Sequence, residues 1–330
     1  MKRAVLLAVF FSALACLLAT NGLAQDAASF YKGKTITILV PSAPGGTFDL
    51  VSRAEAPYIA KYTGARTIIE NSAVIQAQNL LYKSRPDGLT IILCGHGPKE
   101  ITAQLFKEPG FSFDWNKFTL LGRIPSSSTA IVVSRKMGWT KASDMRGKPF
   151  FLGESAPFFG PLFAEALGWD KMSILPGLRG SERSLAMRRG ELQATSAGAG
   201  QVKQDADVML PIAVTTKDNE GFPGVPVVKD IAIKGKEKWG QWASAWDEVM
   251  YWSYATPGIP ADRAAFLEDA LRKTYNDPAF RAQMKKMNME LSDHFVDAKE
   301  LHQITRSIAN LTPSEINEMH YVITQKYLKR

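Results

Sequence analysis

The chain has 330 residues, of which 40 are Lys or Arg and 32 are Asp or Glu, giving a formal net charge of +8. This length provides for two domains of ordinary size. The basic excess is modest and spread along the chain rather than gathered in a stripe, which argues against a nucleic-acid-binding protein, and we expect no nucleic-acid partner.

The N-terminus predicts an export signal. Two basic residues precede the apolar run 4–19, and small residues follow it. This pattern is typical of a cleaved signal peptide, here residues 1–24 with cleavage before Gln25. The run is shorter than the ~20 residues that a membrane-spanning helix needs, and a lipoprotein signal at Cys16 is the weaker alternative.

Strand and helix patterns alternate through the next seventy or so residues. Alternating apolar residues predict strands at 35–40, 66–70 and 90–94, and helical spacing predicts helices at 50–62 and 73–83. This order implies a parallel sheet with right-handed crossovers, whose ligands bind at the carboxyl ends of the strands. Those ends are residues 41–49, 71–72 and 95–97.

The loop Pro41–Asp49 has the features of an anion-binding turn between a strand and a helix. Backbone N–H groups and the helix dipole favour negative charge at such a helix start. Gly45 and Gly46 allow a ligand to approach the backbone closely. Asp49 has two interpretations, a hydrogen-bond acceptor for the ligand or a carboxylate at a helix N-terminus. The loop favours capture of a small anion over catalysis.

The only cysteine beyond the expected signal is Cys94. It ends an apolar run, so we expect a buried thiol, and it has no partner for an intramolecular disulfide. A nucleophilic role would need a base, and only His96 lies near it in sequence.

The pattern in the second half of the sequence predicts another α/β unit followed by helices. Strands are expected at 118–124, 129–134, 148–153, 172–175 and 193–196, and helices at 141–146, 161–167 and 181–189. A return strand at 249–256 leads into helices that begin near residues 260, 278, 298 and 313. We therefore expect a discontinuous first domain, 25–124 with 250–330, and a second domain, 125–249.

A series of short motifs then points to a known family. In chain order they are Lys32-Gly-Lys34, Pro44-Gly-Gly-Thr-Phe-Asp49, Glu70-Asn71, Arg85-Pro-Asp-Gly88, Arg146-Gly-Lys148, Arg179-Gly-Ser181, Arg189-Gly-Glu191 and Pro257-Gly-Ile-Pro260. On these motifs the chain resembles the TctC or Bug family, the periplasmic solute-binding proteins of tripartite tricarboxylate transporters. The resemblance covers essentially the whole chain after the expected signal.

The resemblance implies an α/β, type II periplasmic-binding-protein fold with two domains joined by crossing strands around a central cleft. It implies a monomeric periplasmic protein that binds a small carboxylate through backbone N–H groups and water and delivers it to a membrane permease. No catalytic residue, metal or cofactor is expected. The implied ligand-binding residues are Gly45, Gly46, Thr47, Phe48, Asp49, Asn71, Gly95, His96, Ser155, Ala156, Phe158, Phe159, Arg179, Gly180, Ser181, Ala197 and Gly198.

The chain departs from the family pattern at Phe48, at residues 72–76 and at 157–159, where two of three residues are Phe. These aromatic rings favour an aromatic or apolar-bodied carboxylate over a citrate-like one. Alternatives stay open for individual residues: Arg179 pairs with the ligand or lies on the surface, His96 donates to the ligand or is a loop residue, and the Phe pair stacks on the ligand or belongs to the core.

Two other functions compete with transport. A receptor that presents its ligand to a membrane signalling protein has the same sequence features. A hydrolase is disfavoured, because the chain has no Gly-x-Ser-x-Gly elbow and no His-Glu-x-x-His motif.

Overall fold

The computed structural model describes residues 26–328 except 127, 179, 219 and 290. The expected signal peptide lies outside this range. Within it, none of the helices combines the length and the apolar character that crossing a membrane requires.

The first lobe is built on a five-stranded sheet in the order β2-β1-β3-β10-β4. Strand β1 pairs in parallel with both β2 and β3, and β10 is antiparallel to β3 and β4. The strands span Thr35–Val40 (β1), Arg66–Asn71 (β2), Thr90–Ile92 (β3), Thr119–Arg123 (β4) and Trp252–Ala255 (β10).

The second lobe repeats this topology with the order β7-β6-β8-β5-β9. Strand β6 is parallel to β7 and β8, and β5 is antiparallel to β8 and β9. The strands span Ala130–Ser134 (β5), Phe150–Glu154 (β6), Met172–Pro176 (β7), Ala194–Ala197 (β8) and Met209–Val214 (β9). Each sheet thus receives its antiparallel strand from a chain segment that has just crossed from the other lobe, and the expected α/β fold class is confirmed.

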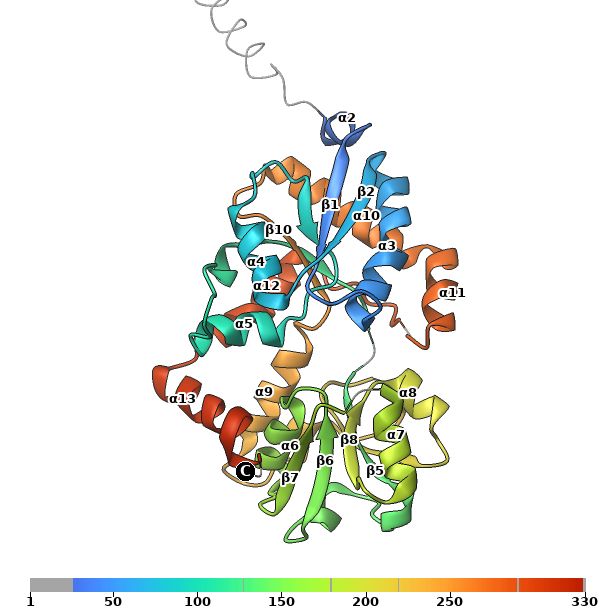
Figure 1. The fold of residues 1–330 in the computed structure, drawn as a ribbon, viewed down its shortest axis with the longest axis vertical. Coiled ribbons are helices and arrows are strands. Elements are labelled where there is room, and N and C mark those ends of the chain that lie inside the picture. The colour runs from blue at the N-terminus through green and yellow to red at the C-terminus, as the bar shows by residue number, and fades with distance from the viewer. Residues whose placement is uncertain (1–25, 127, 179, 219, 290, 329–330) are drawn as a thin grey trace, which may run out of the picture.

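Helices cover both sheets (Figure 1). Those of the first lobe are Ala27–Tyr31 (α2), Thr47–Thr63 (α3), Val74–Lys83 (α4), Pro98–Leu105 (α5), Ala261–Asn276 (α10), Pro278–Lys286 (α11) and Ala298–Ala309 (α12). The second lobe carries Phe159–Leu167 (α6), Gly180–Arg189 (α7), Ala199–Gln204 (α8) and Glu237–Asp247 (α9). Helix α13 (Pro313–Tyr321) leads into a π-helical turn, Val322–Lys326.

Helix starts follow the capping residues that the sequence shows. The Asp277 carboxylate accepts the N–H of Ala279 at the start of α11. Thr312 and Glu315 form a reciprocal capping box at the start of α13, in which each side chain bonds to the other's backbone N–H.

The C-terminal segment returns to the second lobe. Helix α12 packs on β4 of the first lobe, but Leu328 bridges to Ile174 of β7 and the Tyr327 hydroxyl donates to Glu165 of α6 at 2.7 Å. Residues 250–330, expected to go with the first domain, therefore contact both lobes.

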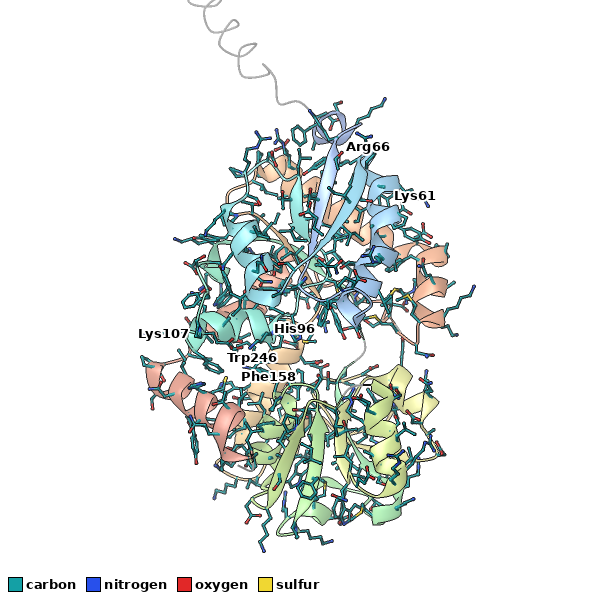
Figure 2. The ribbon with its side chains drawn as sticks, viewed as in Figure 1. Lys61, Arg66, His96, Lys107, Phe158 and Trp246 are labelled. Atoms are coloured by element: carbon teal, nitrogen blue, oxygen red, sulfur yellow. The ribbon has the colours of Figure 1, made fainter. Side chains whose placement is uncertain are left out.

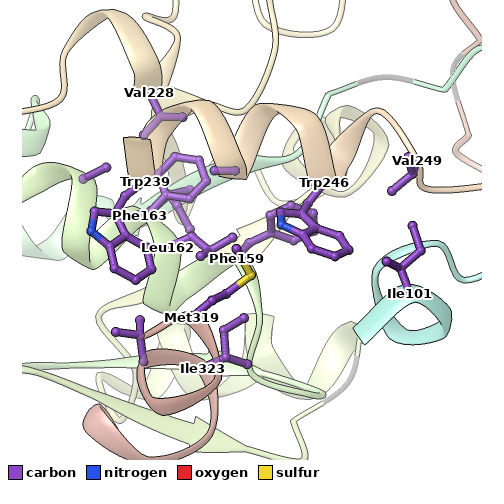
Figure 3. Packing of buried hydrophobic residues seen from close by; sticks show 14 of the residues in the cluster. Ile101, Phe159, Leu162, Phe163, Val228, Trp239, Trp246, Val249, Met319 and Ile323 are labelled. Carbon is purple, nitrogen blue, oxygen red and sulfur yellow. The ribbon is translucent and has the colours of Figure 1, made fainter. Parts of the chain in front are cut away.

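An apolar cluster connects the lobes at α9. Trp246 lies between Phe159 of α6 and Val249, with Ile101 of α5 beyond (Figure 3). The buried Met319 of α13 joins the same cluster from the other side of α6. The core thus continues beside the crossing segments, where it supports the walls of the space between the lobes.

Candidate functional site

A cavity of about 500 Å³ lies between the two lobes. This size suits a small organic ligand. His96 of the first lobe and Phe158 of the second lie on opposite sides of it (Figure 2). A second cavity of about 470 Å³ continues past the crossing segments and shares five wall residues with the first, namely Thr47, Thr129, Gly198, Met250 and Tyr251.

The first-lobe wall is aromatic. Phe48, in the first turn of α3, stacks on the His96 ring with 4.5 Å between ring centroids and packs against Tyr251 at 5.4 Å. Burial lowers the pKa of the His96 imidazole to about 4, so the ring is neutral at pH 7. This wall therefore offers flat apolar surface rather than positive charge.

Tyr251 is held in an unusual backbone conformation at the crossing. Its φ of 60° lies in the left-handed region, where a bulky residue is strained. Its N–H donates to Gly95 O at 3.0 Å and its carbonyl accepts from Ile124 at 3.3 Å. These bonds fix the crossing backbone beside the cavity.

Asp49 organises the β1–α3 loop. Its buried carboxylate accepts hydrogen bonds from Gly45 N at 2.8 Å, from Arg53 Nε at 2.9–3.0 Å and from Asn71 Nδ2 at 2.8 Å. Against the cost of burial, these bonds hold the pKa of Asp49 below its ordinary value, so the group is charged. All of its bonds go to the protein, and neither Asp49 nor Asn71 lines the cavities.

The two loop glycines have structural reasons of their own. Gly45 has a φ of 79°, which L-residues rarely adopt. A Cβ on Gly46 would lie 2.4 Å from Ser42 Oγ and 3.2 Å from Ala43 O. The loop therefore needs glycine for its own packing, whatever it binds.

The second-lobe wall contains a buried carboxylate, Glu154, at the carboxyl end of β6. It is 3% exposed and accepts Phe158 N through Oε2 and Gly160 N through Oε1, both at 2.9 Å. Burial raises the pKa of this carboxyl, and the two N–H bonds oppose that rise. The N-terminus of α6 is thus capped by a carboxyl group of the chain itself.

Arg183 on α7 is the cation of this wall. Its Nη1 donates to Ser196 O at 2.7 Å and to Thr195 Oγ1 at 3.3 Å, which holds the guanidinium over the end of β8. The opposite charge of Glu154 acts on it as well. Among the described wall residues the other cation is Lys99 on α5 of the first lobe, and it is paired with Glu108 at 2.9 Å.

The C-terminal segment closes one side of the cavity. Ile323, Thr324 and Leu328 lie in its wall, as do Phe106 and Met250. The wall is predominantly apolar with a few polar groups, as is usual for small-molecule sites.

The structure divides the expected ligand-binding residues into two groups. Those in the cavity wall are Thr47, Phe48, His96, Ser155, Ala156, Phe158, Phe159, Ala197 and Gly198. Those outside the walls of both cavities are Gly45, Gly46, Asp49, Asn71, Gly95, Gly180 and Ser181. Arg179 lies outside the described residues. The sequence analysis missed Arg183, four residues after Arg179 in the sequence, as well as Glu154 and Tyr251.

The residues near the cavity provide little for covalent chemistry. Cys94 is buried outside the cavity walls, and burial raises the pKa of its thiol. Within residues 26–328, apart from the four undescribed positions, no three His, Cys, Asp or Glu residues gather in a way that could hold a metal ion. The arrangement is suited to holding a ligand.

Comparisons with known proteins agree with this geometry. No family model matches the chain. A UPF0065 protein of Agrobacterium vitis is 25% identical over 278 residues, which cover 77% of this chain and 74% of that protein. A TctC solute-binding protein from Polaromonas, solved without ligand, superimposes with a TM-score of 0.68 at 17% identity over 87% of this chain and 99% of its own. An R. palustris protein with adipate gives a TM-score of 0.60 at 19% identity over 90% and 99%.

These similarities establish the fold as that of periplasmic solute-binding proteins. The expected resemblance to TctC and Bug proteins is confirmed, since the similar structures include a TctC protein and BugD.

Proposed function

We propose that this chain, which has the fold of the TctC and Bug solute-binding proteins, captures a small carboxylate by closing its two lobes and passes it to a tripartite tricarboxylate-type permease. The observation that carries the proposal is the cavity of about 500 Å³ whose walls come from strand-end loops of both sheets. A ligand in this cavity contacts both lobes at once only when the lobes are closed, so ligand binding favours the closed form.

An aromatic or apolar-bodied carboxylate fits this cavity better than citrate. Phe48, Tyr251 and Phe158 supply flat apolar wall, and Arg183 supplies one cation that can pair with a carboxylate. The charge of Lys99 is already balanced by Glu108. A citrate trianion would therefore bring more negative charge than the wall can balance.

A thermal-shift screen tests this preference. We expect 3-phenylpropanoate and hexanoate to raise the unfolding temperature more than citrate or malate at equal concentration. Stabilisation by citrate or malate, with none by the apolar acids, would contradict it.

The proposal extends to the protein's place in the cell. We propose export to the periplasm through a signal at residues 1–24, a discontinuous first domain of residues 25–124 with 250–330, a second domain of residues 125–249, and a monomer that docks on the permease. Uptake of the bound acid by a strain lacking the gene separates transport from sensing. Lost uptake supports transport, whereas normal uptake with lost induction of ligand-dependent genes favours a sensory receptor.

A further inference from the structure

The N-terminus of α6 faces the cavity but has few open donors. The first N–H groups of a helix lack partners within the helix and attract anions. Here the N–H groups of Phe158 and Gly160 both bond to Glu154 at 2.9 Å. The next residue is Pro161, which has no N–H. The amide of Phe159 is therefore the one donor of this turn without a partner among the described residues.

The packing around Glu154 holds its carboxylate in that position. The side chain is 3% exposed, and a Cβ added to Gly160 would lie 3.3 Å from Glu154 Oε2. The Glu154 carboxyl group thus occupies the space beside the first turn of α6 in which a ligand carboxylate could otherwise bind. The carboxyl group occupies this space whether it is charged or protonated.

Among the described residues, the first-lobe cation in the cavity wall is Lys99, and its charge is already balanced by Glu108. The first turn of α3 carries the charged Asp49, which is bound to Gly45, Arg53 and Asn71. The facing wall is Phe48 stacked on a neutral His96. Arg183 of the second lobe forms no salt bridge among the described residues, and the charge of Glu154 acts on it without direct pairing.

We propose that Glu154 is a built-in carboxylate that occupies the amide-lined end of the cavity, so that the site selects an acid with one carboxylate and an apolar body over a dicarboxylate of equal length. The ligand carboxylate pairs with Arg183, and the apolar body lies between Phe48 and Phe158. This inference rests on the proposed function and names its ligand class more narrowly.

Hexanoate and adipate form a matched pair of probes, because they have the same chain length and differ by one carboxylate. Titration calorimetry at pH 7 gives the ratio of their dissociation constants for the wild type, Glu154→Ala and Glu154→Gln. Glu191→Ala, which removes an exposed carboxylate of the same lobe, serves as the control. Thermal unfolding establishes that each variant is folded.

We expect the wild type and the control to bind hexanoate at least about tenfold more tightly than adipate, the scale of one charge-assisted contact. In Glu154→Ala the freed N–H groups should tighten adipate binding by about tenfold and change hexanoate binding by less than about threefold. In Glu154→Gln, which keeps the bulk and removes the charge, a smaller shift toward adipate is expected.

Adipate binding by the wild type as tightly as hexanoate would overturn the proposal, as would an unchanged ratio in a folded Glu154→Ala. If Glu154→Ala does not fold, the ratio in Glu154→Gln decides in the same way. Failure of the wild type and all variants to bind hexanoate, adipate and 3-phenylpropanoate would contradict the proposed function itself, and this proposal with it.

Discussion

Replacing Arg183 with Gln removes the cation on which the proposed carboxylate contact depends. A hydrogen bond to a charged group contributes about 1.5–3 kcal/mol, and each 1.4 kcal/mol is about tenfold in affinity. We therefore expect the dissociation constant for hexanoate to rise by about 10- to 150-fold. The variant also loses the Nη1 bonds to Ser196 O and Thr195 Oγ1, so a lower unfolding temperature is expected as well.

Titration calorimetry with hexanoate, at protein concentrations high enough for weak binding, measures this loss. Arg189→Gln is the matched control, because Arg189 is exposed on the same helix and lies outside both cavity walls. A folded Arg183→Gln protein that binds hexanoate within twofold of the wild type would refute the assignment of the carboxylate to Arg183.

Three further predictions concern the first lobe. Phe48→Ala should weaken 3-phenylpropanoate binding by about 0.5–1.5 kcal/mol more than hexanoate binding, because it removes an aromatic contact; calorimetry giving equal losses would contradict this. Gly46→Ala should lower the unfolding temperature by placing a Cβ 2.4 Å from Ser42 Oγ. Adding Ser42→Ala should restore much of the lost unfolding temperature. A double variant no more stable than the single one would exclude the contact with Ser42 as the cause. The pKa of His96 is about 4 in the folded protein, below the usual 6.5. Between pH 6.5 and pH 4 the unfolded chain therefore binds a proton at His96 that the folded protein does not bind. The free energy of unfolding consequently falls as the pH falls through this range. Urea unfolding at pH 7 and pH 5 should therefore show a loss of up to about 2 kcal/mol that is smaller in His96→Gln, and an equal loss in both proteins would argue against a neutral buried His96.

Most of the predicted fold followed from hydrophobic periodicity and from helix-end signals in the sequence. Strands such as Thr35–Val40 and capped helices such as Pro278–Lys286 and Pro313–Tyr321 formed where periodicity and end signals indicated. Helix α9 was not predicted from the sequence, and it contains a glycine, Gly240, in its interior. The structure explains that glycine, since a Cβ there would lie 2.7 Å from Lys229 Cα. A close backbone contact between segments that are far apart in the chain leaves no pattern in the local sequence from which it could be predicted.

The site was harder to predict because its wall combines segments far apart in the chain. The loop with Thr47 and Phe48 was predicted from strand-end reasoning, whereas the site residues at 155–159 were implied by the family resemblance. Gly46 was explained by close approach of a ligand, whereas the structure shows close approach of Ser42. Glu154 directly follows the strand predicted at 148–153, but its bonds to Phe158 and Gly160 depend on how the chain turns into α6.

The role of the C-terminal segment could not be read from local sequence. Its capping signals predicted a helix at residue 313, which formed. That Ile323 and Leu328 then line the cavity depends on the chain recrossing to the second lobe after α12. Such tertiary placement has no signature in the periodicity of the segment.

The proposed function requires that the two lobes close on a single small carboxylate. Small-angle X-ray scattering of the purified protein, recorded without ligand and with saturating hexanoate, measures this change directly. We expect the radius of gyration to fall on saturation, and we expect no such fall for Arg183→Gln at the same hexanoate concentration. An unchanged radius of gyration in a wild-type sample that calorimetry shows to be saturated would contradict the proposed closure.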